Sequence, residues 1–267
     1  MRKMRLVLIL LAWGILLAVE AMSLVHGEEC AARSRTREVA VRSMKPGEAE
    51  AGLVEASAAN HCLAASGQPF SFRGSCAPDV RYISLLREKE GAAMAELTVP
   101  AIGLDLPIFH GTYEETLEKG AGHMYGTSLP TGGMSTHAVL AGHTGIAGND
   151  LFTRLTEMRE GDLFLVRVLG RNLWYRVDRI VVVEPRAASR YLQVVPGRDF
   201  ITLYTCTPFG VNNQRLLVRG SRIPETSPYL KQKVQRRVGR LDLIRGLFLL
   251  GFPLLALKMR PRGRSSS

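Results

Sequence analysis

The fold of this chain is decided by the stretch Asp199-Phe-Ile-Thr-Leu-Tyr-Thr-Cys206-Thr-Pro-Phe-Gly-Val-Asn-Asn-Gln-Arg215-Leu-Leu-Val-Arg-Gly. Residues 200–206 and 215–223 are dense in aromatic and β-branched side chains, whereas the residues between them are rich in Pro, Gly and Asn. This pattern predicts two antiparallel strands joined by a reversal. With the turn centred near Gly210 and Val211, Cys206 lies opposite Arg215 on one sheet face, with Cβ atoms about 5 Å apart.

Cys206 is a candidate nucleophile because a fixed positive charge beside a thiol favours its ionised form. The thiolate is the reactive species, and a free cysteine has a pKa of about 8.5. A cysteine at the end of a strand is more often a small buried residue, so the hairpin alone does not decide between these interpretations.

A second feature lies in Thr136-His-Ala-Val-Leu-Ala-Gly142-His143-Thr144-Gly145. An apolar strand ends there at His143, and the glycines on either side let the backbone turn and expose the imidazole. The chain therefore contains a Cys, a His and an Arg whose chemistry suits acyl transfer.

The chain changes character near residue 94. Residues 30–93 are rich in Ala, Glu, Arg and Ser with apolar side chains at helical spacing, and they predict helices joined by loops. From residue 95 onward, short apolar runs separated by Gly, Pro and Asp predict seven or eight strands. The expected strands are 96–102, 107–110, 137–143, 163–168, 173–184, 200–206 and 215–223, with short helices near Leu117 and over 151–158. Alternation places one set of side chains on a common face: Phe164, Val166, Val168, Tyr175 and Val177.

These motifs, in this order, resemble the sortases, which are cysteine transpeptidases of the Gram-positive cell surface. The resemblance is carried by Gly142-His143-Thr144-Gly145, Thr202-Leu-Tyr-Thr-Cys206-Thr-Pro and Asn213-Gln-Arg215-Leu-Leu-Val-Arg-Gly. Three further segments are similar to the class C, or pilin-polymerising, branch: Leu106-Pro-Ile-Phe-His-Gly-Thr112, Gly120-Ala-Gly-His-Met-Tyr-Gly-Thr-Ser-Leu-Pro130 and Gly161-Asp162. The resemblance is close over residues 94–223 and looser before them. It implies a mainly β fold built on a sortase-type closed barrel, which leaves no free strand edge.

The resemblance also implies a lid. Class C sortases cover the active site with an Asp-Pro-aromatic motif, whose acid lies near the Arg and whose ring lies near the Cys. The matching positions here are Gln68, Pro69 and Phe70. The acid is missing, so only a neutral hydrogen bond to Arg215 is available, while the Phe70 ring is expected to pack on the thiol. An ordinary loop with a proline turn is the alternative.

The chain has four cysteines, whose oxidation state depends on the cellular compartment in which the protein works. Cys206 must stay reduced to act, even in an oxidising space outside the cell. Cys62 and Cys76 bracket the lid motif, and we predict that they form a disulfide that restrains this loop. Cys30 has no assigned role.

The net charge of +11 fits either a nucleic-acid groove or a membrane surface. The basic residues gather beside two apolar segments, residues 6–25 and 241–257, so we favour membrane contact and expect no nucleic-acid partner. The first segment predicts a membrane anchor, with a cleaved secretory signal as the alternative. The second would be about 26 Å long as a helix, just enough to span, with an interfacial helix as the alternative.

The expected organisation has six parts. They are a membrane anchor or signal (1–29), a helical region with the lid loop (30–93), the catalytic barrel (94–225), a basic linker (226–240), a transmembrane helix (241–257) and a basic tail (258–267). The 46% hydrophobic content is enough for one core of ordinary size. The oligomeric state is left open.

The sequence gives no reason to expect a cofactor or a metal. It contains no Cys-x-x-Cys, no His-Glu-x-x-His and no acidic calcium loop. His110, His123 and His137 are expected to be structural, hydrogen-bonded imidazoles. Tyr204 and Thr205 flank the nucleophile and are candidates for the peptide groove, with core packing as the alternative.

For acyl transfer we assign Cys206 as the nucleophile and His143 as the general acid and then the general base. Arg215 is the cation that stabilises the oxyanion or orients the peptide. By resemblance, the substrate is an LPXTG-like sorting signal and the acceptor is a pilin lysine amine, which builds covalent pili at the Gram-positive cell surface. Two alternatives stay open: a sortase that anchors single proteins to the wall, or a hydrolytic thiol peptidase. A non-enzymatic surface adhesin is the third, but it would not need His143, Cys206 and Arg215 together.

Overall fold

The computed structural model describes residues 47–72, 80–86, 92–144 and 151–230. Both predicted membrane segments, the basic tail, Cys30 and Cys76 lie outside these residues. The chain divides into two compact units, 1–223 and 224–267, and the described part of the second is a turn and one short helical segment over 224–230. Within the described ranges, no helix has the length and apolar character needed to cross a bilayer.

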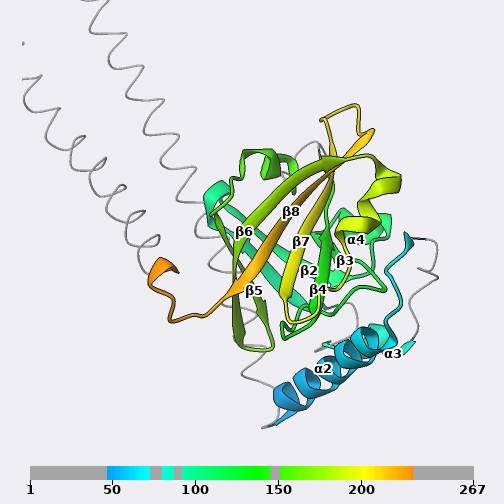
Figure 1. The fold of residues 1–267 in the computed structure, drawn as a ribbon, viewed down its shortest axis with the longest axis vertical. Helices are drawn as coiled ribbons and strands as arrows, with labels where there is room; N and C mark the ends of the chain where they lie inside the picture. Colours follow the sequence, from blue (N-terminus) through cyan, green and yellow to red (C-terminus); the bar gives the residue numbers. More distant parts are fainter. Residues whose placement is uncertain (1–46, 73–79, 87–91, 145–150, 231–267) are drawn as a thin grey trace, which may run out of the picture. The chain divides into compact units, whose positions relative to one another are not determined.

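Eight strands close into a barrel in the order β1-β2-β3-β4-β7-β8-β6-β5 (Figure 1). Their bounds are β1 Ala95–Val99, β2 Leu104–His110, β3 Ala121–His123, β4 Thr136–Ala141, β5 Leu163–Val168, β6 Arg171–Val183, β7 Asp199–Thr207 and β8 Gln214–Ile223. Two neighbouring pairs, β2 with β3 and β4 with β7, are parallel, and the other six pairs are antiparallel. The closed, mainly β barrel expected from the sequence is therefore confirmed.

The barrel interior is filled by the side chains that alternation along the strands assigns to one face. Phe164 and Tyr175 stack with ring centroids 5.4 Å apart and are fully buried, together with Val166, Val168 and Val177. Gly220 lies against this pair, since a Cβ at that position would come within 2.5 Å of the Phe164 ring. The interior is therefore packed with side chains and leaves the outer face of the strands to carry the site.

The described helices are α2 Glu48–Ser66, α3 Val80–Ser84, α4 Glu114–Leu117 and the 3-10 helices η2 Pro100–Ile102, η3 Thr153–Glu157 and η4 Pro185–Tyr191. The short helices predicted near Leu117 and over 151–158 correspond to α4 and η3, whereas η2 and η4 were not predicted. The long helix α2 packs on the barrel through buried Leu53 and Ala56. Its Asn60 side chain accepts from the Leu129 N–H at 2.7 Å and donates to the Leu129 carbonyl at 3.0 Å. These contacts fix the start of the segment that carries Gln68, Pro69 and Phe70.

Several elements differ from the sequence prediction. The second strand begins at Leu104 rather than at residue 107, and β4 ends at Ala141 rather than at His143. The first strand ends at Val99 rather than at Ile102, because Pro100 has no N–H for the ladder and begins η2. The strand β3 was not predicted, because its short Ala-Gly-His run has no β-branched or aromatic residue. Gly122 is needed there, since a Cβ would lie 2.3 Å from the carbonyl oxygen of Gly111.

Candidate active site

Cys206 and Arg215 lie opposite each other in the antiparallel pairing of β7 with β8, as the sequence predicts. The turn between them contains Gly210 and Asn212, both with positive φ, at 78° and 56°. Glycine and asparagine are the residues that adopt this left-handed conformation most readily. The Pro, Gly and Asn residues of this turn therefore set the strand register that places a thiol beside a guanidinium.

The guanidinium of Arg215 is held by three hydrogen bonds. Its Nε donates to the hydroxyl of Tyr204 at 3.1 Å, and one Nη donates to the carbonyls of Asn212 and Gln214, each at 2.9 Å. Tyr204 is half-buried, and burial raises its pKa above the usual value although Arg215 acts in the opposite direction. A neutral phenol beside the arginine fixes the cation without neutralising it.

His143 is brought to Cys206 by the parallel pairing of β4 with β7. The N–H of Gly142 donates to the carbonyl of Tyr204 at 3.1 Å, and the Thr205 hydroxyl donates to the Gly142 carbonyl at 2.6 Å. On the other side of His143, the Thr144 hydroxyl donates to the carbonyl of Cys206 at 3.0 Å. Both neighbours of the histidine are therefore hydrogen-bonded to the strand segment that ends in the nucleophile.

Glu114, at the start of α4, faces the imidazole of His143. Its Oε1 lies 3.1 Å from His143 Nε2, at an orientation that does not make a hydrogen bond. The Nε2 atom has no access to solvent and no hydrogen-bond partner among the described residues, although the side chain as a whole is 27% exposed. The carboxylate is 70% exposed. No motif in the sequence connects Glu114 to a histidine that far along the chain, so this acid was not among the predicted site residues.

A tight contact fixes the backbone before His143. A Cβ on Gly142 would lie 2.7 Å from the ring of Phe152, which is fully buried. The Phe152 N–H also donates to the His143 carbonyl at 3.0 Å. Gly142 is therefore required for close packing, since its φ is not positive.

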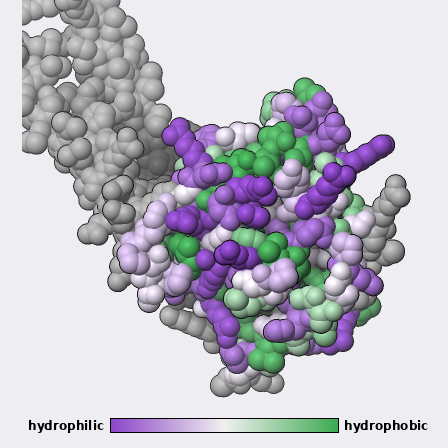
Figure 2. Space-filling view, viewed as in Figure 1, coloured by the Kyte–Doolittle hydropathy of each residue, from purple (hydrophilic) through white to green (hydrophobic). Residues whose placement is uncertain are grey.

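The outer face of β4, β7 and β8 carries an apolar floor next to these polar groups. We call it the outer cluster; it consists of buried Met124, Val139, Ala141, Ala188, Leu192 and Leu217. Tyr204 packs against it, and its place in a peptide groove stays a prediction. Thr205 is 2% exposed, and its hydroxyl is bonded to Gly142, so it holds the histidine loop and does not line a groove. On the molecular face seen in Figure 2, hydrophobic patches alternate with hydrophilic residues.

The segment that carries the predicted lid motif lies against this face. The Phe70 ring packs on the outer cluster and meets Phe72 edge to face with centroids 5.2 Å apart, while Phe72 lies 6.2 Å from Tyr204. The described hydrogen bonds of Arg215 do not include Gln68, whose own N–H points to the Ser66 hydroxyl at 3.3 Å. The neutral bond expected between Gln68 and Arg215 is thus not among the described contacts. Cys62 is an exposed free thiol on α2, and Cys76 lies outside the described residues, so their disulfide stays a prediction.

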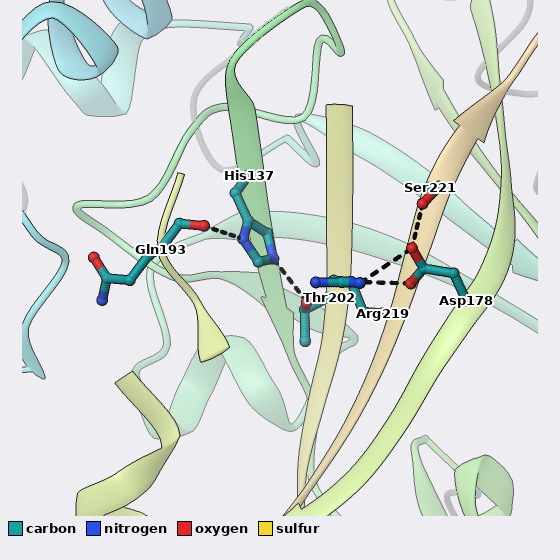
Figure 3. A network of polar contacts seen from close by, with 6 residues as sticks. All are labelled: His137, Asp178, Gln193, Thr202, Arg219 and Ser221. Atoms are coloured by element: carbon teal, nitrogen blue, oxygen red, sulfur yellow. Dashed lines mark hydrogen bonds and ion pairs between the residues drawn. The ribbon is translucent and has the colours of Figure 1, made fainter. Parts of the chain in front are cut away.

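A polar row crosses four strands beside the outer cluster (Figure 3). His137 on β4 bonds Thr202 on β7 through Nε2 and the carbonyl of Gln193 through Nδ1, both at 2.8 Å. Beyond them, Arg219 on β8 pairs with Asp178 on β6 at 2.9 Å. Burial lowers the pKa of His137 from 6.5 to about 4, so the ring is neutral at physiological pH. Because a carbonyl only accepts, Nδ1 carries the proton and Nε2 accepts from the Thr202 hydroxyl.

The other two histidines that were expected to be structural, His123 and His110, also have hydrogen-bonding partners. His123 is fully buried between the Tyr82 hydroxyl and the Ser128 carbonyl, each 2.8 Å away, and burial lowers its pKa to about 4. His110 lies 2.7 Å from the carbonyl of Leu85. Among the described residues, no group of three or more His, Cys, Asp or Glu side chains is arranged to hold a metal ion.

Comparison with known proteins agrees with this geometry. The Sortase domain family matches residues 97–223. A crystal structure of Streptococcus agalactiae Sortase C1 is similar, with a TM-score of 0.66 and 39% sequence identity, covering 71% of this chain and 97% of that chain. This chain belongs to the sortase family. It is therefore a cysteine transpeptidase, and the thiol, imidazole and guanidinium described above are its candidate catalytic groups.

Other solved structures similar to this sortase are also of class C. Sortase C-1 from Actinomyces oris is 43% identical with a TM-score of 0.61, covering 67% of this chain and 99% of that chain. Sortase C from Streptococcus pneumoniae, whose structure concerns pilin substrate specificity, is 38% identical with a TM-score of 0.63, covering 72% and 96%. A lid mutant of the S. agalactiae enzyme is 39% identical with a TM-score of 0.64, covering 71% of this chain and 96% of that chain.

Proposed function

We propose that this sortase is a pilin polymerase, which cleaves an LPXTG-like sorting signal and transfers it to a lysine amine of another pilin subunit. The observation that carries the catalytic part is the register of β7 and β8, which sets Cys206 opposite Arg215 with the His143 loop bonded alongside. The pilin acceptor is supported by similarity to class C structures at 38–43% identity and by the lid-like segment on the outer cluster.

The first half-reaction needs a thiolate, an acid and a cation. The Cys206 sulfur attacks the carbonyl carbon of the Thr-Gly peptide bond, and the oxyanion that forms is stabilised by the fixed charge of Arg215. His143 donates its proton to the departing glycine nitrogen, so the amine leaves neutral and a thioester joins the threonine to the enzyme.

The second half-reaction reverses these roles. The neutral imidazole of His143 takes a proton from the incoming lysine amine, which attacks the thioester carbonyl. Collapse of the tetrahedral intermediate expels the Cys206 thiolate and leaves an isopeptide bond. Sulfur, proton and charge return to their starting places, so no cofactor is required. We place this chemistry outside the cell membrane, with the barrel held there by the terminal apolar segments 6–25 and 241–257.

A two-step experiment tests the proposal. The detergent-solubilised full chain is incubated with an LPXTG-type peptide, and mass spectrometry locates any acyl adduct. We expect the adduct on Cys206, its absence from Cys206→Ala, and no adduct on Cys62, which is an exposed thiol in the same chain. Absence of an adduct from the unchanged chain would refute the nucleophile.

The second step adds the acceptor. Purified pilin with its lysines intact should form isopeptide-linked oligomers, and pilin with methylated lysines should not. Release of free peptide acid alone would instead identify a hydrolase. Transfer to a cell-wall amine but not to pilin would identify the anchoring function.

A further inference from the structure

Gln193, which follows η4, has no part in the chemistry above, yet its side chain holds the lid segment at two points. The Phe70 N–H donates to Gln193 Oε1 at 2.9 Å, and Gln193 Nε2 donates to the Phe70 carbonyl at 3.1 Å. A side-chain amide thus satisfies both backbone groups of one residue. A neighbouring β-strand pairs with an extended chain in the same way, without reading its side chains.

The Gln193 amide is held in place by the protein. Its Nε2 also donates to the Ser189 carbonyl at 2.5 Å, within the 3-10 helix η4. On the opposite side of the residue, the backbone carbonyl accepts the proton of neutral His137, as Figure 3 shows. The amide is therefore oriented toward the outer face by contacts that do not involve the lid, and it loses little freedom when an extended chain binds it.

The Phe70 side chain makes apolar contacts beside the two hydrogen bonds of its backbone. Its ring lies on the outer cluster and beside Gly126, where a Cβ would be in ordinary van der Waals contact with the ring at 3.7 Å. The two hydrogen bonds of Gln193, which we call the backbone clamp, and the outer cluster together accept the backbone and the large apolar side chain of one residue. The outer cluster includes Ala141, the last residue of β4 before the histidine loop, and Leu217, two residues beyond Arg215 on β8.

We infer that the Gln193 amide and the outer cluster form a subsite for the extended peptide substrate, binding the backbone and apolar side chain of one of its residues. Phe70 of the lid segment occupies this subsite in the place of the substrate. The inference rests on the proposed function, since it concerns the peptide that the enzyme cleaves. It assigns lid closure and substrate binding to one neutral clamp, so the two compete for it.

The clamp has a consequence for how the lid is held. Both contacts to Phe70 are between uncharged groups, and Arg215 is bonded to Tyr204 and to the turn instead. Added salt screens ion pairs but leaves neutral hydrogen bonds nearly unchanged. Closure is therefore expected to be insensitive to ionic strength.

The test uses Gln193→Leu in the full chain, since leucine is close in size but can neither donate nor accept. With the lid intact, we expect iodoacetamide to alkylate Cys206 about 5- to 100-fold faster, the effect of losing two neutral hydrogen bonds. With the protein reduced beforehand, so that the predicted Cys62–Cys76 disulfide cannot block it, alkylation of exposed Cys62 is the internal control and should not change. An unchanged rate at Cys206 would show that Gln193 does not hold the lid, which overturns the inference.

The decisive measurement is peptide binding with the lid disabled. In a Phe70→Ala/Phe72→Ala background that also carries Cys206→Ala, fluorescence anisotropy measures the Kd of a labelled LPXTG-type peptide without any chemistry. Adding Gln193→Leu should raise this Kd about 5- to 100-fold. Gln193→Glu keeps an acceptor and loses the amide donor. Its Kd should therefore lie between that of the background variant with Gln193 and that of the variant with Gln193→Leu. An unchanged Kd would make Gln193 a lid latch only and would refute the shared subsite.

These outcomes separate the inference from the proposed function. If the peptide binds but forms no adduct with the unchanged thiol, the transpeptidase proposal fails and the subsite stands. If the adduct forms in the lid-disabled chain but Gln193→Leu leaves its yield at low peptide concentration unchanged, the subsite fails alone. Equal thermal midpoints for all variants show that the fold is unchanged.

Discussion

Gly142→Ala tests whether close packing behind His143 positions the active site. The added Cβ would lie 2.7 Å from the Phe152 ring, closer than carbon atoms approach, and that ring is fully buried. Overpacking of this kind costs about 1–3 kcal/mol. For a domain of this size, each kcal/mol lowers the thermal midpoint by about 2–4 °C. The hydrogen bonds of Gly142 to the nucleophile strand would shift as well, so kcat/KM for the peptide should fall with stability.

The assay is a double-mutant cycle with Phe152→Leu. Leucine at 152 alone leaves a cavity and destabilises the protein. In the double variant, the alanine methyl enters the space that the ring has left. We therefore expect the two free energies of unfolding to be non-additive, with a favourable coupling of about 0.5–3 kcal/mol, and a partial recovery of kcat/KM.

An additive cycle would refute this reasoning, because it would mean that the two sites do not interact. A loss of stability with full activity would refute the second half of the argument. In that case the packing of Gly142 would be structural and would not set the place of the imidazole.

Three further predictions concern charged and titratable groups. Arg215→Lys should lower kcat/KM about 100-fold while leaving the thermal midpoint nearly unchanged, since lysine cannot make the fixed fork of hydrogen bonds that directs the cation; a loss below tenfold would contradict the role. The urea midpoint should fall as the pH drops from about 6.5 to about 4, because His123 and His137 have folded pKa values of about 4 and the unfolded chain takes up protons first. His137→Gln should flatten this slope, and an equal slope would show that the histidine is not buried as described. Glu114→Gln should change kcat/KM less than about fivefold, because exposed ion pairs contribute little; a larger loss would make this acid a functional partner of His143.

The sequence predicts the centre of the site well because its determinants are local. The Pro, Gly and Asn residues between Cys206 and Arg215 form a turn that sets the register of the two strands. The structure has the Cys206–Arg215 pairing that this turn predicts. The apolar run before His143 likewise predicts β4, which ends at Ala141, and alternation predicts the barrel-interior face of β5 and β6.

The parts that sequence reasoning missed depend on contacts between distant segments. Gln193 reaches Phe70 across 123 positions, and nothing in the run Leu192-Gln-Val-Val-Pro marks this glutamine as special. Glu114 meets His143 through the packing of a four-residue helix, which no spacing rule predicts. The strand β3 is stabilised by its neighbours and by close glycine contacts, so its own propensities give no signal.

The parallel pairing of β4 with β7 has a consequence for folding. The contact of Thr205 with Gly142 joins positions 63 residues apart, and β5, β6 and η4 lie between them in the chain. Barrels with such non-local contacts fold in about milliseconds to seconds. The chain must lose the entropy of closing the long loop before the hydrogen bonds between the two strands can form and stabilise it. Until that closure, the segment around His143 is not hydrogen-bonded to the end of β7, so Cys206 lacks its imidazole partner. The speed of barrel assembly therefore decides how soon a newly made molecule gains a complete active site.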